Sequence, residues 1–191
     1  MSKVWMWSDL HLGHDNAINW RKEFKTAEEH HETLFDNLAT AVGKRDVLYL
    51  LGDIAMSTEW LTRVCSIPCV KRIAVLGNHD TEKRGGVEGY HLAAQFDEIH
   101  SLMKYRTSRG LPNIWLSHAP IHEQELRGCI NIHGHTHDHN ITRKGRKPTW
   151  YGSKVVDVLD KRYVNICPEQ TDWKPVNFQQ LLQKLREEKL L

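Results

Sequence analysis

The chain has 191 residues, a length that favours one domain with a sizeable hydrophobic core. Charged residues make up 26% and hydrophobic residues 40%, as in ordinary soluble proteins, and a net charge of +2 gives no argument for nucleic-acid or membrane binding. Nucleic acid stays compatible with that charge but is not indicated by it. Because no apolar run is long enough for a signal peptide or a membrane span, we expect a cytoplasmic protein.

Four cysteines and 13 histidines are the residues to account for first. Only Cys65 and Cys69 lie near each other, and no second close pair completes a four-thiolate zinc site. We therefore expect buried thiols in a reducing compartment. The histidines are more informative, because four of them fall in the stretch NIHGHTHDH at residues 131–139.

The first third of the chain predicts a strand and then a helix. Residues 3–9, KVWMWSD, form a short apolar run of the kind that becomes a buried strand. In residues 26–43, Thr26 and Glu29 fit a capping box, and Gly43 is suited to end the helix. The apolar stripe of this helix consists of Leu34, Leu38 and Val42. We expect His30 and His31 to lie on its solvent-exposed side.

The middle of the chain continues this alternation. Residues 46–53 and 72–80 are strand-like runs, and each is followed by a predicted helix, at 57–67 and 85–96. Alternating strands and helices predict an α/β fold whose strands are mostly parallel. Two further strand-like runs, NIWLSHAP and INIHGHTH, occupy residues 113–120 and 130–137.

The last part of the chain has more predicted strand than helix. Residues 154–166 suggest a hairpin that turns around 159–161, and residues 168–175 suggest a loop. The final prediction is an amphipathic helix over 178–190. With no repeat, low-complexity tract or linker, we expect residues 1–191 to form a single domain.

Polar residues capable of binding metal follow the ends of five of these strand-like runs. They are Asp9, His11, Asp53, Asn78, His79, Asp80, His118, His135 and His137. In an open α/β sheet, ligands bind at the carboxyl ends of the strands, so these side chains are expected at one rim. Carboxylate, imidazole and amide donors suit manganese, iron, zinc or magnesium, and their number exceeds what one ion needs. The pattern predicts a binuclear metal centre.

The ordered motifs D-x-H, GD, GNHD, H and GHxH resemble those of the calcineurin-like metallophosphoesterase family. They run from Asp9 to His137, and the tail from Val164 to Leu182 is similar to that of compact bacterial and phage members. The resemblance implies a four-layer α/β/β/α sandwich. It also implies two divalent metal ions, with manganese favoured over iron, zinc, nickel or magnesium.

The resemblance assigns a role to each motif residue. One metal would be held by Asp9, His11 and His137, the other by Asn78, His118 and His135, and Asp53 would bridge the two. A metal-bridging hydroxide would attack phosphorus in line. His79 would protonate the leaving oxygen or stabilise the transition state, and Asp80 would orient His79.

Several residues beside the motifs are secondary candidates. We expect His14 and His122 to be placed to touch the phosphate of the substrate. His133 is expected to support the site, and His139 to lie on its rim. The basic loop TRKGRKP, Thr142 to Pro148, is either solvated or steers a phosphate-rich substrate.

The leading function is hydrolysis of a phosphodiester, in a nucleotide or another small phosphoester. A phosphomonoesterase of the protein-phosphatase type would carry Asp-Arg-Gly and GNHE, whereas this chain reads GDIAMST and GNHD. Two further functions fit the motifs less well, that of a nuclease and that of a non-catalytic interaction scaffold. The scaffold is disfavoured because His79 and all the ligands are present. Metal identity, diester or monoester preference and oligomeric state stay open.

Overall fold

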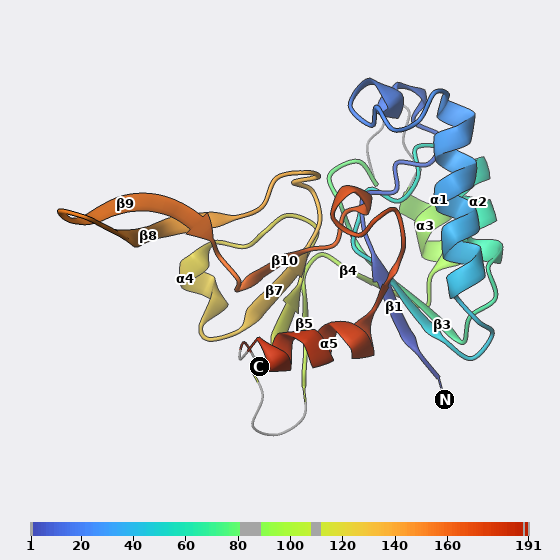
Figure 1. Ribbon diagram of the computed structural model, residues 1–191. Helices are drawn as coiled ribbons and strands as arrows, with labels where there is room; N and C mark the ends of the chain where they lie inside the picture. The colour runs from blue at the N-terminus through green and yellow to red at the C-terminus, as the bar shows by residue number, and fades with distance from the viewer. Residues whose placement is uncertain (1, 81–88, 108–111, 189, 191) are drawn as a thin grey trace.

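A five-stranded sheet is formed by four strands from residues 4–100 of the chain and one from near its end. The computed structural model describes residues 2–80, 89–107, 112–188 and 190 (Figure 1). The order of the strands is β11-β1-β2-β3-β4, in which β1 to β4 are parallel and β11 is antiparallel to β1. Their bounds are β1 Val4–Trp7, β2 Val47–Leu50, β3 Lys71–Val75, β4 Glu98–His100 and β11 Val176–Asn177.

Three helices cover one face of this sheet (Figure 1). They are α1 Ala27–Ala41, α2 Thr58–Ser66 and α3 Gly89–Gln95. The hydroxyl of Thr26 accepts a hydrogen bond from the backbone of Glu29, and Ser57 caps α2 in the same way. The first two predicted helices are confirmed, and residues 85–88 of the third lie outside the described residues. Where the chain is described, none of its helices is both long and apolar enough to span a membrane.

A second sheet packs against the other face of the first. Its order is β10-β7-β6-β5, with bounds β10 Tyr163–Asn165, β7 Ile130–His133, β6 Ile114–Leu116 and β5 Met103–Tyr105. The core between the sheets contains Met6, Leu51, Val75, Leu116 and Ile132, together with Phe178 and Leu185 of α5 Phe178–Glu187. The α/β class is confirmed, while the expected fourth layer stays a prediction.

The remaining elements are short or project from the body. Two 3₁₀ turns, η1 Asp15–Asn19 and η2 Pro168–Gln170, and one short helix, α4 Glu123–Leu126, lie in the connections. Strands β8 Thr142–Thr149 and β9 Gly152–Leu159 form a separate two-stranded antiparallel hairpin. It extends away from both sheets at the left of Figure 1. We call residues 142–159 the β8–β9 arm.

The predicted hairpin around 159–161 is wrong. The turn lies at Trp150 and Tyr151, because Thr149 pairs with Gly152, and β10 pairs in parallel with β7 instead of with β9. The expected basic loop at 142–148 is likewise a strand. Alternating apolar residues indicate that a segment is extended, but they do not identify the strand that it pairs with.

The expectation that His30 and His31 face solvent is also wrong, because both side chains are buried. The ring of His31 packs edge-on against Trp60 of α2, with the centroids 5.2 Å apart. His30 accepts a hydrogen bond of 2.7 Å from the guanidinium of Arg21, and its Nδ1 lies 2.8 Å from Nδ1 of His31. This side of α1 is therefore a buried polar interface.

Candidate metal centre

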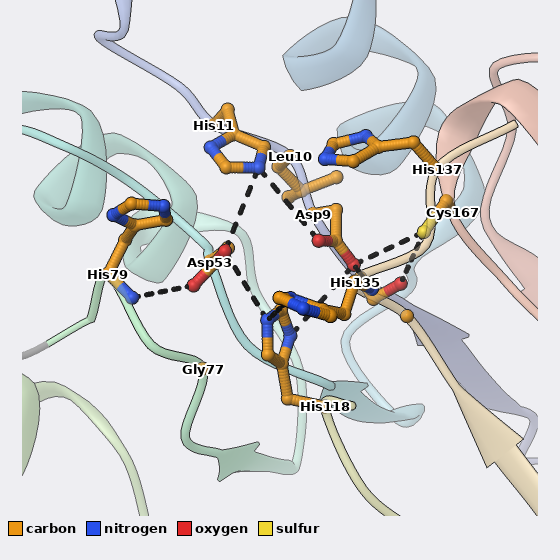
Figure 2. A network of polar contacts seen from close by, with 12 residues as sticks. Asp9, Leu10, His11, Asp53, Gly77, His79, His118, His135, His137 and Cys167 are labelled. Carbon is orange, nitrogen blue, oxygen red and sulfur yellow. Dashed lines mark hydrogen bonds and ion pairs between the residues drawn. The ribbon is translucent and has the colours of Figure 1, made fainter. Parts of the chain in front are cut away.

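The carboxyl ends of five strands from both sheets deliver the predicted ligands to one rim. Asp9 follows β1, Asp53 follows β2, Asn78 follows β3, His118 follows β6, and His135 and His137 follow β7. Figure 2 shows the histidine rings and the two carboxylates converging around a common centre. The structure thus brings together residues that lie up to 128 positions apart in the chain.

The carboxylate of Asp53 lies between two histidines. Its Oδ1 accepts a hydrogen bond of 2.9 Å from the backbone of His79. Its Oδ2 lies 3.8 Å from Nε2 of His11 and 3.3 Å from Nε2 of His118 (Figure 2). One oxygen of Asp53 is therefore fixed by the backbone, and the other faces both sides of the centre.

His118 has one ring nitrogen held by the protein and one directed into the centre. Its Nδ1 donates to the carbonyl of Leu51 at 3.0 Å, which leaves Nε2 to bind a metal. That Nε2 lies 3.0 Å from Oδ1 of Asn78 and 3.1 Å from Nδ1 of His135. Burial disfavours the charged ring, but the hydrogen bond to Asp53 and the charge of Asp9 raise the pKa of His118 to about 9. The carboxylates thus stabilise a positive charge at this position.

The other side of the centre is formed by Asp9 and His11. Oδ2 of Asp9 accepts from the backbone of His135 at 2.8 Å and from the thiol of Cys167 at 3.3 Å. Its Oδ1 and both ring nitrogens of His11 are buried without a hydrogen-bond partner among the described residues. Burial and the charge of Arg21 lower the pKa of His11 well below its usual value, which keeps the ring neutral. Buried, unsatisfied donor atoms of this kind fit a metal ion.

Arg21 and Glu169, which the sequence did not suggest, brace this side of the site. The fully buried guanidinium of Arg21 donates to the carbonyls of Asp9 and Leu10, at 2.6 and 3.1 Å, and to Glu169 at 2.8 Å. Glu169 accepts a further bond of 2.9 Å from Nδ1 of His137. Burial opposes its charge, but the bond from His137 and the charge of Arg21 lower the pKa of Glu169 to about 2. These contacts fix the ring of His137 and leave its Nε2 for a ligand.

The backbone is left-handed at five of the seven predicted ligands, the exceptions being Asn78 and His118. The φ angles are +53° at Asp9, +49° at His11, +49° at Asp53, +69° at His135 and +48° at His137. Residues other than glycine adopt such angles at a cost, and they do so where the surrounding structure holds them. Strands β1, β2 and β7 therefore end in turns that aim these side chains at the rim.

Two glycines leave the space that the carboxylates occupy. A Cβ atom at Gly134 would collide with Oδ2 of Asp9, and a Cβ atom at Gly77 would collide with Oδ1 of Asp53. Asp80 sets the same turns, because its carboxylate accepts from the backbone amides of Asp53, Ile54 and Gly77 at 2.7 to 3.0 Å. These bonds fix the backbone on both sides of the Asp53 carboxylate.

A pocket of about 610 Å³ opens over the centre. The rings of His14, His79 and Trp20 line it beside His11, with Trp20 43% exposed. The centroid of Trp20 lies 5.3 Å from that of His14 and 6.1 Å from that of His137. The sequence did not single out Trp20, and its exposed ring offers a stacking surface at the pocket mouth.

The other secondary candidates lie further from the centre. His122 is exposed and accepts from the backbone of Gln124 at the start of α4, so it lines a different pocket. His133 is buried, and its Nδ1 bonds with the carbonyl of Gly134 at 2.8 Å, as a supporting residue would. His139 is exposed on the pocket rim.

The donor atoms form groups compact enough to hold metal ions. Asp9, His11 and Asp53 make one group, and Asp53, His118 and His135 make a second. A third consists of Asp9, His137 and Cys167, and within each group the atoms lie within 4.8 Å of one another. Asp53 belongs to two groups and Asp9 to two, so the groups are contiguous.

The sequence model of the calcineurin-like phosphoesterase family matches residues 2–184 of this chain, a range that includes every residue of this centre. The chain belongs to this family. Membership makes it a metal-dependent phosphoester hydrolase, and the Asp and His groups described above are suited to divalent metals.

Relatives of this family member are found in phages and bacteria. The Gene 66 protein of Mycobacterium phage L5 is 31% identical over 163 residues, which cover 72% of this chain and 78% of the phage protein. The Gene 66 protein of Mycobacterium phage D29 is 30% identical over 165 residues, 74% and 81% of the two chains. A solved protein of unknown function from Aquifex aeolicus has a TM-score of 0.67 and 25% identity, covering 96% of this chain and 99% of its own.

Proposed function

We propose that this phosphoesterase is a binuclear enzyme that hydrolyses phosphodiesters, in nucleotides or other small phosphoesters. The observation that carries the proposal is the position of Asp53, whose Oδ2 faces His11 on one side and His118 on the other. In the proposal, Asp9, His11 and His137 would hold one ion, Asn78, His118 and His135 would hold the second, and Asp53 would contribute to both. Manganese is the first metal to test. Two bound metal ions would polarise the phosphoryl group and supply a nucleophile at neutral pH.

Two residues of the protein would assist the reaction, one by protonating the leaving oxygen and one by positioning the backbone of the site. The backbone N–H of His79 is fixed on Asp53, and its ring lies 5.8 Å from the ring of His11 across the pocket. From there His79 would donate a proton to the leaving oxygen. Asp80 would act as a positioning residue, because it holds the backbone of both the Asp53 and the Gly77 turns.

The lining of the pocket supports a diester over a monoester. The described residues that line it include six histidines, Trp20, Thr136 and Asp138, with no lysine or arginine among them. A monoester phosphate carries nearly two negative charges and is commonly held by arginine or lysine. A diester carries one charge, which the metal centre suffices to balance.

Two broader predictions accompany this proposal. We propose that residues 1–191 act as one domain, because both sheets contribute ligands to the same centre. We also propose a cytoplasmic protein, which the free thiols of Cys65, Cys69, Cys129 and Cys167 support.

The test is a manganese-supplemented comparison of four substrates. These are bis-p-nitrophenyl phosphate, p-nitrophenyl phosphate, a cyclic nucleotide and a short oligonucleotide. The proposal predicts faster turnover of the diesters than of the monoester. A higher kcat/KM for p-nitrophenyl phosphate would favour the monoesterase, and no turnover of any of the four would favour an interaction scaffold.

His79→Ala separates chemistry from metal binding. It should retain the metal content of the wild type while losing about 10²–10⁴-fold in kcat. His100→Ala is the matched control, since His100 lies on β4 and bonds with Glu98 outside the pocket. Wild-type kcat in His79→Ala would remove His79 from the reaction.

A further inference from the structure

The β8–β9 arm is a two-stranded ribbon whose two faces are both largely exposed to solvent. An isolated two-stranded hairpin is marginally stable in water, and apolar side chains on it gain little from burial in the protein. Yet Val155 is 59% exposed and Leu159 52% exposed on this ribbon. The arm therefore presents a surface that the described part of the chain does not cover.

Positive charge is concentrated on the arm. Residues 142–159 contain five cationic side chains, Arg143, Lys144, Arg146, Lys147 and Lys154, against one acidic side chain, Asp157, a net charge of +4. The whole chain carries +2, so the remaining residues carry −2. Only Lys144 is paired, with Asp157 at 2.9 Å, and the other four cations form no salt bridge with any described residue. The arm thus suits a polyanion.

The tip of the arm is aromatic. Trp150 is 93% exposed and Tyr151 is 96% exposed, at the two turn positions between Thr149 and Gly152. Aromatic rings flanked by free cations suit single-stranded nucleic acid, because its bases are available for stacking while its phosphates meet the cations. In a duplex the bases already stack on one another, which leaves these rings without a partner.

The base of the arm leads to the metal centre. Thr142 follows His137 by five residues, and Asn165 just beyond the arm donates to the carbonyls of His137 and His139 at 2.9 and 3.1 Å. A cavity of about 1160 Å³ lies at this base, lined by Arg143 and Lys144 of β8 and by residues 120–122, which follow the predicted ligand His118. A single strand of nucleic acid bound along the arm would pass close to the candidate metal centre.

We propose that the β8–β9 arm binds single-stranded nucleic acid and directs it toward the metal centre. The binding claim is independent of hydrolysis, whereas the cleavage of a polymeric strand rests on the proposed phosphodiesterase. Contact between the arms of two copies of the chain is disfavoured, since two arms that each carry +4 repel one another.

Binding is measured with EDTA-treated protein, so that turnover plays no part. The probe is a fluorescein-labelled oligothymidylate of about 16 nucleotides, the upper range of common site sizes. We expect Trp150→Ala/Tyr151→Ala to raise Kd about tenfold or more through lost stacking. Arg146→Ser/Lys147→Ser should make the negative slope of log association constant against log salt concentration shallower by about 1.4, which corresponds to two lost phosphate contacts.

The matched control removes the same two charges elsewhere. Lys44→Ser/Arg45→Ser changes exposed residues before β2, at the opposite ends of the parallel strands from the metal centre. This control should leave Kd and the salt slope unchanged. An equal loss in the control and the arm variants, or no binding by the wild type, would overturn the proposal.

Two further measurements identify other occupants. A change of oligomeric state in sedimentation of the tip variant would assign the arm to a second copy of the chain. Arm-dependent binding to phosphatidylserine vesicles without binding to the oligonucleotide would assign it to a membrane surface, and both results contradict the proposal. If the phosphodiesterase is established, the tip variant should cleave oligonucleotides more slowly and hydrolyse bis-p-nitrophenyl phosphate at the wild-type rate.

Discussion

The metal-site rim and the β8–β9 arm lie next to each other in the chain, yet they are held in opposite ways. At the rim, five residues keep left-handed backbone angles, and Asp9, Asp53 and His118 are buried. In the arm, the strands pair with each other and with no other described strand, and nearly every side chain is exposed. The rim is specified by contacts from both sheets, and the arm is specified by its own pairing alone.

The difference shows where each region can tolerate change. The left-handed backbone angles at the rim persist because several independent contacts hold the same backbone. These contacts come from Arg21, from Asp80 and from the paired strand ends. Removing one of these contacts leaves a buried charge or polar group unpaired, which is costly. The arm has no such contacts to lose, so its substitutions should act on binding and leave stability unchanged.

The largest contrast is expected from one substitution made in both regions. Asp53→Asn should lose most of its bound metal and about 10³-fold or more in kcat, because metal catalysis contributes several kcal/mol. Asp157→Asn on the arm, where the exposed aspartate pairs with Lys144, should keep the metal content and the kcat of the wild type. Elemental analysis and hydrolysis of bis-p-nitrophenyl phosphate measure the two effects. Full metal content in Asp53→Asn would contradict the bridging role.

The next effect tests the bracing of the rim by Arg21. Arg21→Met removes the cationic partner of the buried Glu169 and leaves it only the bond from His137 among the described residues, so we expect a loss of about 3–5 kcal/mol in the free energy of unfolding. Metal affinity should also fall about 10–100-fold, because the bond that orients His137 is weakened. Arg63→Met is the control, since its pair with Glu32 is half-exposed and worth about 1 kcal/mol or less. Equal losses in the two variants, by urea denaturation, would contradict a special role for Arg21.

The rim was predictable because of where strands end. Each run of apolar residues indicated a strand, and parallel strands bring their carboxyl ends to one edge, so Asp9, Asp53 and His118 could be placed together from the sequence. The same rule would have found Cys167 and Glu169, which follow β10 directly. The mistaken hairpin at 154–166 hid them, because it assigned that strand to the wrong partner.

Other features had no signal in the sequence. Arg21 and His30 belong to no motif, and their burial depends on the packing of α1 against η1 and α2. A helix with one apolar stripe does not reveal that a second face is covered by polar contacts. The overall charge of +2 did not indicate the +4 on the arm, because the rest of the chain offsets it, whereas the basic run at 142–148 did. Local charge was informative where the total was not.

The buried face of α1 predicts a pH effect. Burial and the charge of Arg21 lower the pKa of His30 from 6.5 to about 3, so between these values the unfolded chain binds the extra proton. The stability from His30 is therefore complete above pH 6.5 and is lost as the pH falls toward 3. Between pH 6.5 and 5 the metal-free wild type should lose about 2 kcal/mol more than His30→Gln. His139→Gln, at an exposed position, should follow the wild type, and parallel curves for all three would contradict the burial of a neutral His30.

The smallest effect is expected on the arm itself. Leu159→Ala should change the free energy of unfolding by no more than about 0.5 kcal/mol, as at other exposed positions, because the side chain packs little against the protein. Leu116→Ala, which removes a fully buried side chain between the two sheets, should cost about 2–5 kcal/mol. Urea denaturation of both variants measures the difference. A cost above 2 kcal/mol for Leu159→Ala would mean that the arm is packed against the body in solution, and its surface would then be occupied by the protein's own chain. A negligible cost, with small-diester hydrolysis unchanged, would leave the surface of the arm free to bind a partner beside the rim.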